Sequence, residues 1–168
     1  LEVAMAGREG MLGIPLVLNV KESQSIALVQ GAGSALRMTA ESFQRLLFSS
    51  PVLHQRLKRY IYVAMSQLAT SAACNHFHRI EERLARWLLM TQDRAGADQL
   101  NLTHEFLAMM LGVRRAGITL AAIALQAHGL IRYQRGTITV LDRLGLIEAS
   151  CECYSKDCAL YAKMLPVL

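Results

Sequence analysis

The 168-residue sequence predicts an α+β fold in which helices dominate and the strands are short. Three observations support this. Glycines separate short β-rich pieces in the first part of the chain, and a helical pattern then runs from Pro51 to His78 without interruption. After Arg79, further helical patterns are followed by a tight hairpin. An apolar content of 53% is enough to build hydrophobic cores, which excludes a disordered chain.

The charge of the chain favours an anionic partner but does not specify one. A net charge of +5 is compatible with nucleic acid, a membrane surface or an acidic protein. Between Arg79 and Arg143 every Lys or Arg position is an arginine, whose planar fork of donors suits phosphates and guanine edges. A solvated surface, partly paired with nearby carboxylates, would explain some of these arginines equally well.

No secretory leader and no membrane partner are expected. The apolar run MLGIPLVLNV lacks a basic leader and a small-residue cleavage site. No uninterrupted apolar stretch approaches the roughly 20 residues that cross a bilayer. Four cysteines without a regular framework suit a reducing cytoplasm, so we expect a cytoplasmic protein.

The first part of the chain is expected to form strands joined by turns. Ser25–Gln30 (SIALVQ) is β-rich, and glycines follow it. Thr39 then fits the N-cap of a helix whose buried face would be Phe43, Leu46 and Leu47. A segment this short cannot close a stable sheet alone, so we interpret it as the later part of a larger unit.

A long helix is predicted from Pro51 to His78. Proline fits its first turn, and apolar positions then recur at spacings of four, three and four, which match a coiled-coil seam. At 1.5 Å per residue the helix would be roughly 40 Å long, more than a small domain covers on all sides. We expect a dimer interface, although a helix lying across its own domain gives the same pattern. The candidate interface residues are Leu57, Ile61, Ala64, Leu68 and Ala72.

Helical spacing returns after the long helix. This next helix should end before Gly96, and the segment AGADQLN then follows as a loop. Trp87 is interpreted as a core residue, because a single tryptophan at helical spacing is more often packed than exposed at a binding site. The predicted core face is Ile80, Leu84, Trp87 and Leu88.

Two helices joined at a sharp turn come next. Thr103 can cap the first helix, and Gly112 lies where the chain must turn. The second helix runs from Arg115 to about Ala127 and is stopped at Gly129. Its predicted buried face is Ile118, Ala121, Ala122 and Leu125.

A hairpin and a last helix complete this part. Two short alternating segments, LIRY and TITVL, flank Gln134, Arg135 and Gly136, and Asp142 can cap the helix that follows. The order helix, helix, turn, helix and two-stranded hairpin is that of a winged helix-turn-helix.

The run from His78 to Arg143, HRIEERLARWLLMTQDR…LTHEFLAMMLGVRRAGITLAAIALQAHGLIRYQRGTITVLDR, resembles the DNA-binding half of Crp/Fnr-type bacterial transcription regulators. The long helix resembles their dimerisation helix. EGMLGIPL and SIALVQGAGSALRM are similar to the later part of their cyclic-nucleotide-binding-like sensor barrel. The resemblance implies a partial β jelly-roll sensor domain over 1–49, a dimerisation helix over 50–78, a winged helix-turn-helix over 79–148 and a helical tail over 149–168.

The resemblance implies a homodimer that places one recognition helix per subunit in the major groove of double-stranded DNA. Arg114 and Arg115 would begin this helix, where arginine can donate two hydrogen bonds to a guanine; contact with phosphate alone is the alternative for Arg115. Gly117 would allow close approach to DNA, and Thr119 is a candidate for a base contact. The candidate backbone contacts are Thr103, His104, Gln134 and Arg135.

Departures from the family pattern change the expected target and effector. Ala116 stands where glutamate often contacts cytosine, and Leu120 where a second arginine often contacts bases. The stretches GMLGIPL and SQSIALV lack the arginine that holds a cyclic phosphate, so we expect no familiar response to cyclic AMP. RNA polymerase is a candidate partner, and the effector and the operator stay open.

An enzyme is not expected, because the sequence has no glycine-rich phosphate loop, nucleophile elbow or paired-carboxylate motif. The alternative function is a winged-helix module for protein contacts, carried on a dimeric scaffold without sequence-specific DNA binding.

No metal and no cofactor are expected. Cys151, Cys153 and Cys158 form CxCx4C, a poor spacing for tetrahedral zinc, which usually prefers CxxC; Cys74 is far away in sequence. His76 and His78 should face different sides of a helix, which leaves the pair unable to chelate well. We therefore expect ordinary reduced thiols.

Overall fold

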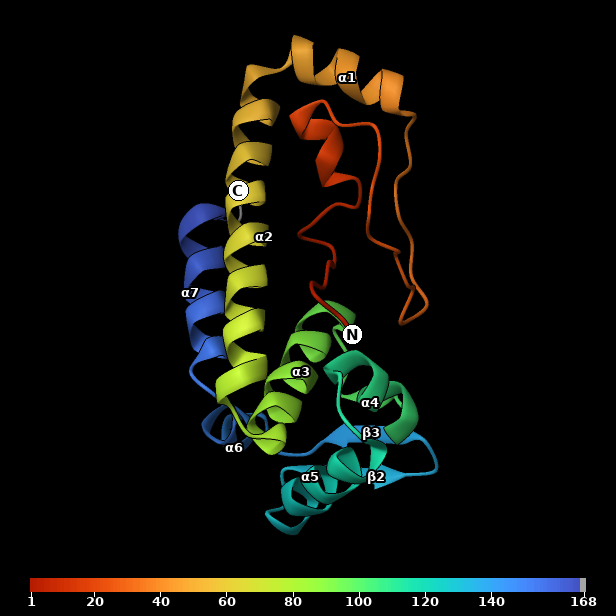
Figure 1. Cartoon of the computed structure of the whole chain (residues 1–168), viewed down its shortest axis with the longest axis vertical. Helices are drawn as coiled ribbons and strands as arrows, with labels where there is room; N and C mark the ends of the chain where they lie inside the picture. Colours follow the sequence, from red (N-terminus) through yellow and green to blue (C-terminus); the bar gives the residue numbers. More distant parts are fainter. Residues whose placement is uncertain (167–168) are drawn as a thin grey trace.

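A long helix organises the computed structural model, which describes residues 1–166. Helix α2 (Pro51–Phe77) has α7 (Cys153–Met164) along its side and α1 (Ala40–Ser49) at its N-terminal end (Figure 1). The helices between residues 80 and 149 and the three strands of the described residues gather toward the other end of α2. The predicted α+β class, with short strands and a C-terminal winged helix-turn-helix, is confirmed.

Residues 1–39 form no strand; the part that includes residues 14–18 lies beside α2, and the later part loops away from α2 before α1 begins (Figure 1). Their only regular element is the 3₁₀-helix η1 (Ile14–Leu18). The strand expected at Ser25–Gln30 is therefore wrong, and residues 1–49 do not form a jelly-roll sheet. The physical reason is the lack of a partner: a β-rich segment needs a neighbouring ladder, and Ile26 and Val29 here are 97% and 85% exposed. That this part derives from a sensor barrel stays a prediction.

Helix α1 begins where the sequence predicts. Thr39 accepts a hydrogen bond from the Ser42 amide, and Phe43 and Leu47 are buried. Leu46, expected on the same face, is instead 39% exposed. Helix α1 packs mainly on η1 and α2, so only Phe43 and Leu47 are buried among its described residues.

Helix α2 has the predicted limits. The Ser50 side chain accepts from the Leu53 amide, Pro51 occupies the first turn, and His78 ends the helix in an extended conformation. Its covered face consists of Tyr60, Val63, Gln67 and Cys74, which pack under α7 and the N-terminal segment.

The winged domain begins with α3 (Ile80–Ala95), which ends at Gly96 with φ 62°. A three-stranded antiparallel sheet follows, made of β1 (Gln99–Asn101), β2 (Ile131–Gln134) and β3 (Thr137–Val140) in the order β1-β3-β2. The segment AGADQLN was expected to be a loop, but it contains β1. Leu100 pairs with Ile138 and is buried, so the open edge of the hairpin and the core recruit this short strand.

The core of this domain lies between α3 and the helices and strands that cover it. The described chain contains one large buried apolar cluster, and the predicted core residues of α3 and α5 belong to it, with Ile80 partly buried at its margin. Helix α6 (Arg143–Ala149), capped by Asp142 through the Gly145 amide, packs on α3.

No single helix in residues 1–166 is both long and apolar enough to cross a membrane. Helices α4 and α5 pass that test only as a pair, and they are bent by 109°.

Candidate nucleic-acid interface

Helices α4 (His104–Leu111) and α5 (Arg115–Ala127) form the helix-turn-helix. Thr103 caps α4 by accepting from the Phe106 amide at 3.2 Å. Gly112 then adopts φ 65°, a left-handed conformation that glycine enters without steric cost. The chain turns there, and the 109° bend falls in the range of helix-turn-helix motifs.

Helix α5 has one buried and one open face. Ile118, Ala121, Ala122 and Leu125 are buried in the domain core, as predicted, and the helix packs mainly on α3. The opposite face carries Arg115, Ala116, Leu120 and Ile123, which are exposed. The packing on α3 therefore holds a solvent-facing helix whose N-terminus carries Arg114 and Arg115.

The arginines between Arg79 and Arg143 divide into two groups. Four are held by protein partners: Arg83 donates to Asn75 and to the Leu111 carbonyl, Arg86 pairs with Asp157, Arg94 with Glu9 and Arg143 with Asp93. The others are exposed and lie on α5, on the wing or just before α3: Arg79, Arg114, Arg115, Arg132 and Arg135. No ion pair involves any of these five within residues 1–166. The free positive charge of this segment thus gathers around α5 and the hairpin.

His104 connects three elements of the domain through its side chain, and its predicted contact with the DNA backbone stays a prediction. Its ring stacks on Tyr133 with centroids 4.1 Å apart, and Nδ1 lies 3.0 Å from the Thr119 hydroxyl oxygen. Burial, followed by the charge of Arg115, lowers the pKa of His104, so the ring is neutral near pH 7. The Thr119 hydroxyl in turn donates to the Arg115 carbonyl at 3.1 Å. His104 thus ties α4, α5 and the wing together.

Gly117 faces a neighbour that sequence reasoning missed. A Cβ at this position would lie 2.8 Å from Cδ1 of Ile80, the flexible end of a half-buried side chain, so a larger residue would require Ile80 to shift. The predicted role of Gly117 in close approach to DNA stays a prediction.

The wing tip matches the predicted hairpin. Arg135 and Gly136 take φ values of 49° and 81°, as a tight two-residue turn requires, and both Gln134 and Arg135 are exposed. Sequence reasoning missed Gln126, whose side chain accepts from the Tyr133 amide at 2.8 Å and fixes the wing to α5. The only sequence feature that points to this contact is the polar character of Gln126, next to the last residue of α5.

The candidate dimer residues lie along one side of α2, but they are unequally exposed. Leu57, Ile61 and Ala64 are half-buried, whereas Leu68 and Ala72 are exposed. Met65, an exposed apolar residue next to this side of the helix, was not among the candidates. The open stripe is therefore displaced toward Met65 relative to the predicted seam.

A second cluster lies where α2 meets α7. Cys74, His78, Cys151 and Cys153 come together there, with Cys74 and the two later cysteines buried. Cys158, the third cysteine of the CxCx4C pattern, is exposed and lies outside the cluster. Sequence reasoning separated these residues, because Cys74 and Cys151 are 77 positions apart and only the fold brings them together.

These features define the class of the C-terminal part: a winged helix-turn-helix domain with an arginine-bearing second helix. Residues 82–149 match the model of the Crp-like helix-turn-helix domain family. The resemblance to Crp/Fnr regulators is thereby confirmed.

Solved structures support the same fold. A crp/fnr-family transcriptional regulator from Eubacterium rectale is 26% identical with a TM-score of 0.51, covering 66% of this chain and 51% of that one. FixK2 from Bradyrhizobium japonicum is 16% identical with a TM-score of 0.58, covering 67% and 59%. A mutant of CooA from Carboxydothermus hydrogenoformans is 20% identical with a TM-score of 0.53, covering 64% and 53%.

The matched region therefore spans between 51% and 59% of the length of these three relatives. No curated protein matches the sequence.

Proposed function

We propose that this chain is a sequence-specific DNA-binding transcription regulator that acts as a homodimer, with α5 of each subunit in the major groove. The observation that carries the proposal is the division of the arginines. Those that the fold needs are paired internally, whereas Arg114, Arg115, Arg132 and Arg135 are left in solvent around α5 and the wing. Exposed arginines at this place suit contacts with phosphates and guanines.

The exposed residues of α5 support a DNA target whose base sequence differs from the usual target of the family. Arg115 is its one charged residue at the helix start, and Leu120 and Ile123 are 69% and 57% exposed. Apolar side chains in the major groove can contact thymine methyl groups. We therefore propose half-sites with a guanine near Arg115 and thymines beside the apolar residues. As expected from the sequence, we propose no familiar response to cyclic AMP.

The same apolar residues favour one competing function. Leu120 and Ile123 could instead dock a protein, which would make this a winged-helix interaction module. The two functions differ in their dependence on salt. Contacts between arginines and phosphates release counterions, so DNA affinity falls steeply as salt rises, whereas an apolar protein contact does not require this.

Replacing Arg135 with alanine should weaken binding to every DNA sequence by a similar factor. Arg135 lies exposed at the wing tip, where it can contact phosphate but no base. Fluorescence anisotropy across a salt series should show the slope of log affinity against log salt falling by about 1. Arg45→Ala, at an exposed arginine of α1, is the matched control and should leave the slope unchanged. Salt-independent binding, or no DNA binding by the parent protein, would favour the interaction module.

Replacing Leu68 with glutamate should convert the dimer to a monomer. Leu68 is 44% exposed on the stripe that we assign to the interface, and a charge there would be buried without a partner on association. Val52→Glu changes an exposed residue on another side of the same helix and is the control. Sedimentation equilibrium should show at least about tenfold weaker association for Leu68→Glu alone. Equal association of the two variants would place the interface elsewhere.

A further inference from the structure

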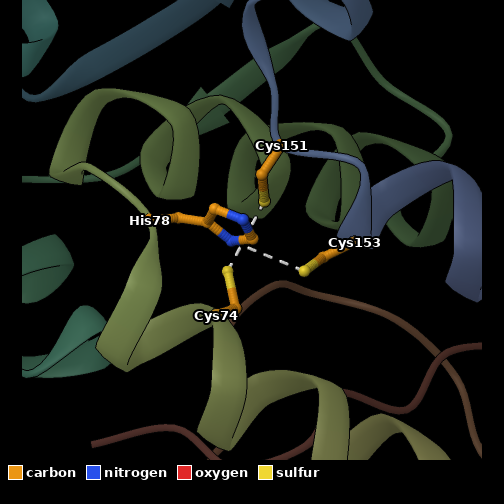
Figure 2. A group of neighbouring side chains, drawn as sticks. All are labelled: Cys74, His78, Cys151 and Cys153. Carbon is orange, nitrogen blue, oxygen red and sulfur yellow. Dashed lines mark hydrogen bonds between the residues drawn. The ribbon is translucent and has the colours of Figure 1, made fainter.

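Four metal-binding side chains meet at the C-terminal end of α2. Figure 2 shows Cys74 and His78 from the end of α2, Cys151 from the connection after α6, and Cys153 from the start of α7, all directed toward a common centre. Their donor atoms all lie within 4.8 Å of one another. The Sγ atoms of Cys74 and Cys151 are 3.5 Å apart, and Sγ of Cys153 is 3.6 Å from Nδ1 of His78.

Two of the donor–donor separations match the edges of a tetrahedral metal site. With metal–sulfur bonds of about 2.3 Å and a metal–nitrogen bond of about 2.0–2.1 Å, tetrahedral donors stand roughly 3.5–3.8 Å apart. Both separations fit this edge length, and the other donor pairs lie within 4.8 Å of one another. The ligand set of three sulfurs and one imidazole is also a standard structural zinc set.

The local sequence explains how the ligands converge. Cys74 and His78 are four residues apart at the end of α2, so they share one face of its last turn. Cys151 and Cys153 are the first and third residues of a turn in which the Tyr154 amide donates to the Cys151 carbonyl at 3.1 Å. Their two-residue spacing is poor for chelation alone, but α2 supplies the other half of the site.

A second layer of contacts orients the histidine. Nε2 of His78 lies 3.2 Å from Oε2 of Glu152, the residue between the two cysteines. Metal-bound histidines usually donate their other ring nitrogen to a carboxylate in this way, which fixes the tautomer and leaves Nδ1 free for the metal. Behind the cysteines, Arg83 and Arg86 line the same small cavity as Cys74.

We propose that Cys74, His78, Cys151 and Cys153 bind one mononuclear thiophilic divalent ion of the zinc type. Binding of the ion releases the three thiol protons to solvent and forms three metal–sulfur bonds and one metal–nitrogen bond, with no change of oxidation state. The resulting single negative charge faces the guanidinium groups of Arg83 and Arg86. Four protein ligands leave no open position, so the site is structural rather than catalytic.

The ion would join two parts of the chain that are otherwise held by packing. It fixes the C-terminal end of α2 to the start of α7. Only Arg79 separates the ligand His78 from Ile80, the first residue of α3. The orientation of the winged domain on the long helix would then depend on the metal. This inference stands apart from the proposed function, because it does not require that the protein bind DNA.

The test is metal binding by the whole reduced chain. We expect one equivalent of zinc per chain by elemental analysis, and cobalt(II) in its place should give thiolate-to-metal charge-transfer bands and the strong visible bands of a tetrahedral ion. Cys151→Ser and Cys153→Ser should lose the stoichiometric metal, and His78→Ala should bind it weakly. Cys158→Ser and His76→Ala, at a neighbouring exposed cysteine and histidine, are the matched controls and should keep it.

Replacing Glu152 with glutamine should weaken metal affinity about 10–100-fold while leaving the spectrum tetrahedral. The cobalt spectrum of the parent protein does not depend on whether any variant folds. Reduced protein that takes up neither zinc nor cobalt would overturn the proposal. So would the visible absorbance of an iron–sulfur cluster, or equal loss of metal in Cys153→Ser and Cys158→Ser.

Discussion

Replacing Asp157 with alanine lowers the free energy of unfolding by about 3–5 kcal/mol. Oδ2 of Asp157 lies 2.8 Å from Nη2 of Arg86, and the two side chains are only 6% and 9% exposed. Removing the carboxylate leaves a buried guanidinium whose Nε already lacks a partner within residues 1–166. Chemical denaturation followed by circular dichroism measures the change directly.

The pair itself is not expected to add much net stability. Burial raises the pKa of the Asp157 carboxyl even though Arg86 lowers it, whereas burial lowers the pKa of Arg86 and the hydrogen bond and charge of Asp157 raise it, so desolvation and attraction largely offset each other. A double variant, Arg86→Met with Asp157→Leu, should therefore recover most of the loss. Glu22→Ala, an exposed carboxylate in the N-terminal segment, is the single-site control and should change stability by less than about 0.5 kcal/mol. A loss below about 1 kcal/mol for Asp157→Ala would show that the charge is not buried in solution.

Replacing Arg115 with alanine should cost about 1–3 kcal/mol of DNA binding and abolish discrimination at one base pair. Arg115 is the first residue of α5 and is exposed, so its guanidinium can reach a guanine edge in the major groove. Anisotropy with duplexes that differ at single positions of the preferred site should show the parent protein discriminating at that pair and the variant binding all four alternatives alike.

Arg135→Ala is the control for this loss of specificity, because it should weaken all duplexes equally and keep their ranking. If Arg115→Ala also kept the ranking, Arg115 would contact phosphate only. The base contacts would then have to come from elsewhere on α5.

Much of the helical part of the fold is predictable, because its signals are local. Thr39, Ser50, Thr103 and Asp142 cap the helices that follow them, and periodic apolar residues set the buried face of α5. Gly112 marks the turn because few other residues enter its conformation at low cost.

The failures concern contacts between distant segments. Ser25–Gln30 has the composition of a strand but no ladder to join, whereas Gln99–Asn101 becomes a strand because β3 offers an edge. The arginine set could not be sorted from sequence, since the partners of Arg86 and Arg143 lie 71 and 50 residues away.

In the candidate site, too, features set by local sequence are predictable and features set by contacts between distant segments are not. Arg115 and the wing tip at Arg135 are exposed on the predicted elements, because capping and turn signals position them. The neighbours of His104 and Gly117 include Tyr133 and Ile80, which approach only in the folded domain. The cysteine cluster likewise needs α7 to return to the end of α2.

The most direct test of the central claim is selection of bound fragments from random double-stranded DNA by the purified chain at moderate salt, followed by sequencing. The account predicts enrichment of a two-fold symmetric site with half-sites about 34–36 Å apart, one helical turn between centres. The Arg115→Ala protein should lose one conserved guanine from each half-site. Failure to enrich any symmetric site, with the protein folded and dimeric, would contradict the proposal that α5 recognises DNA.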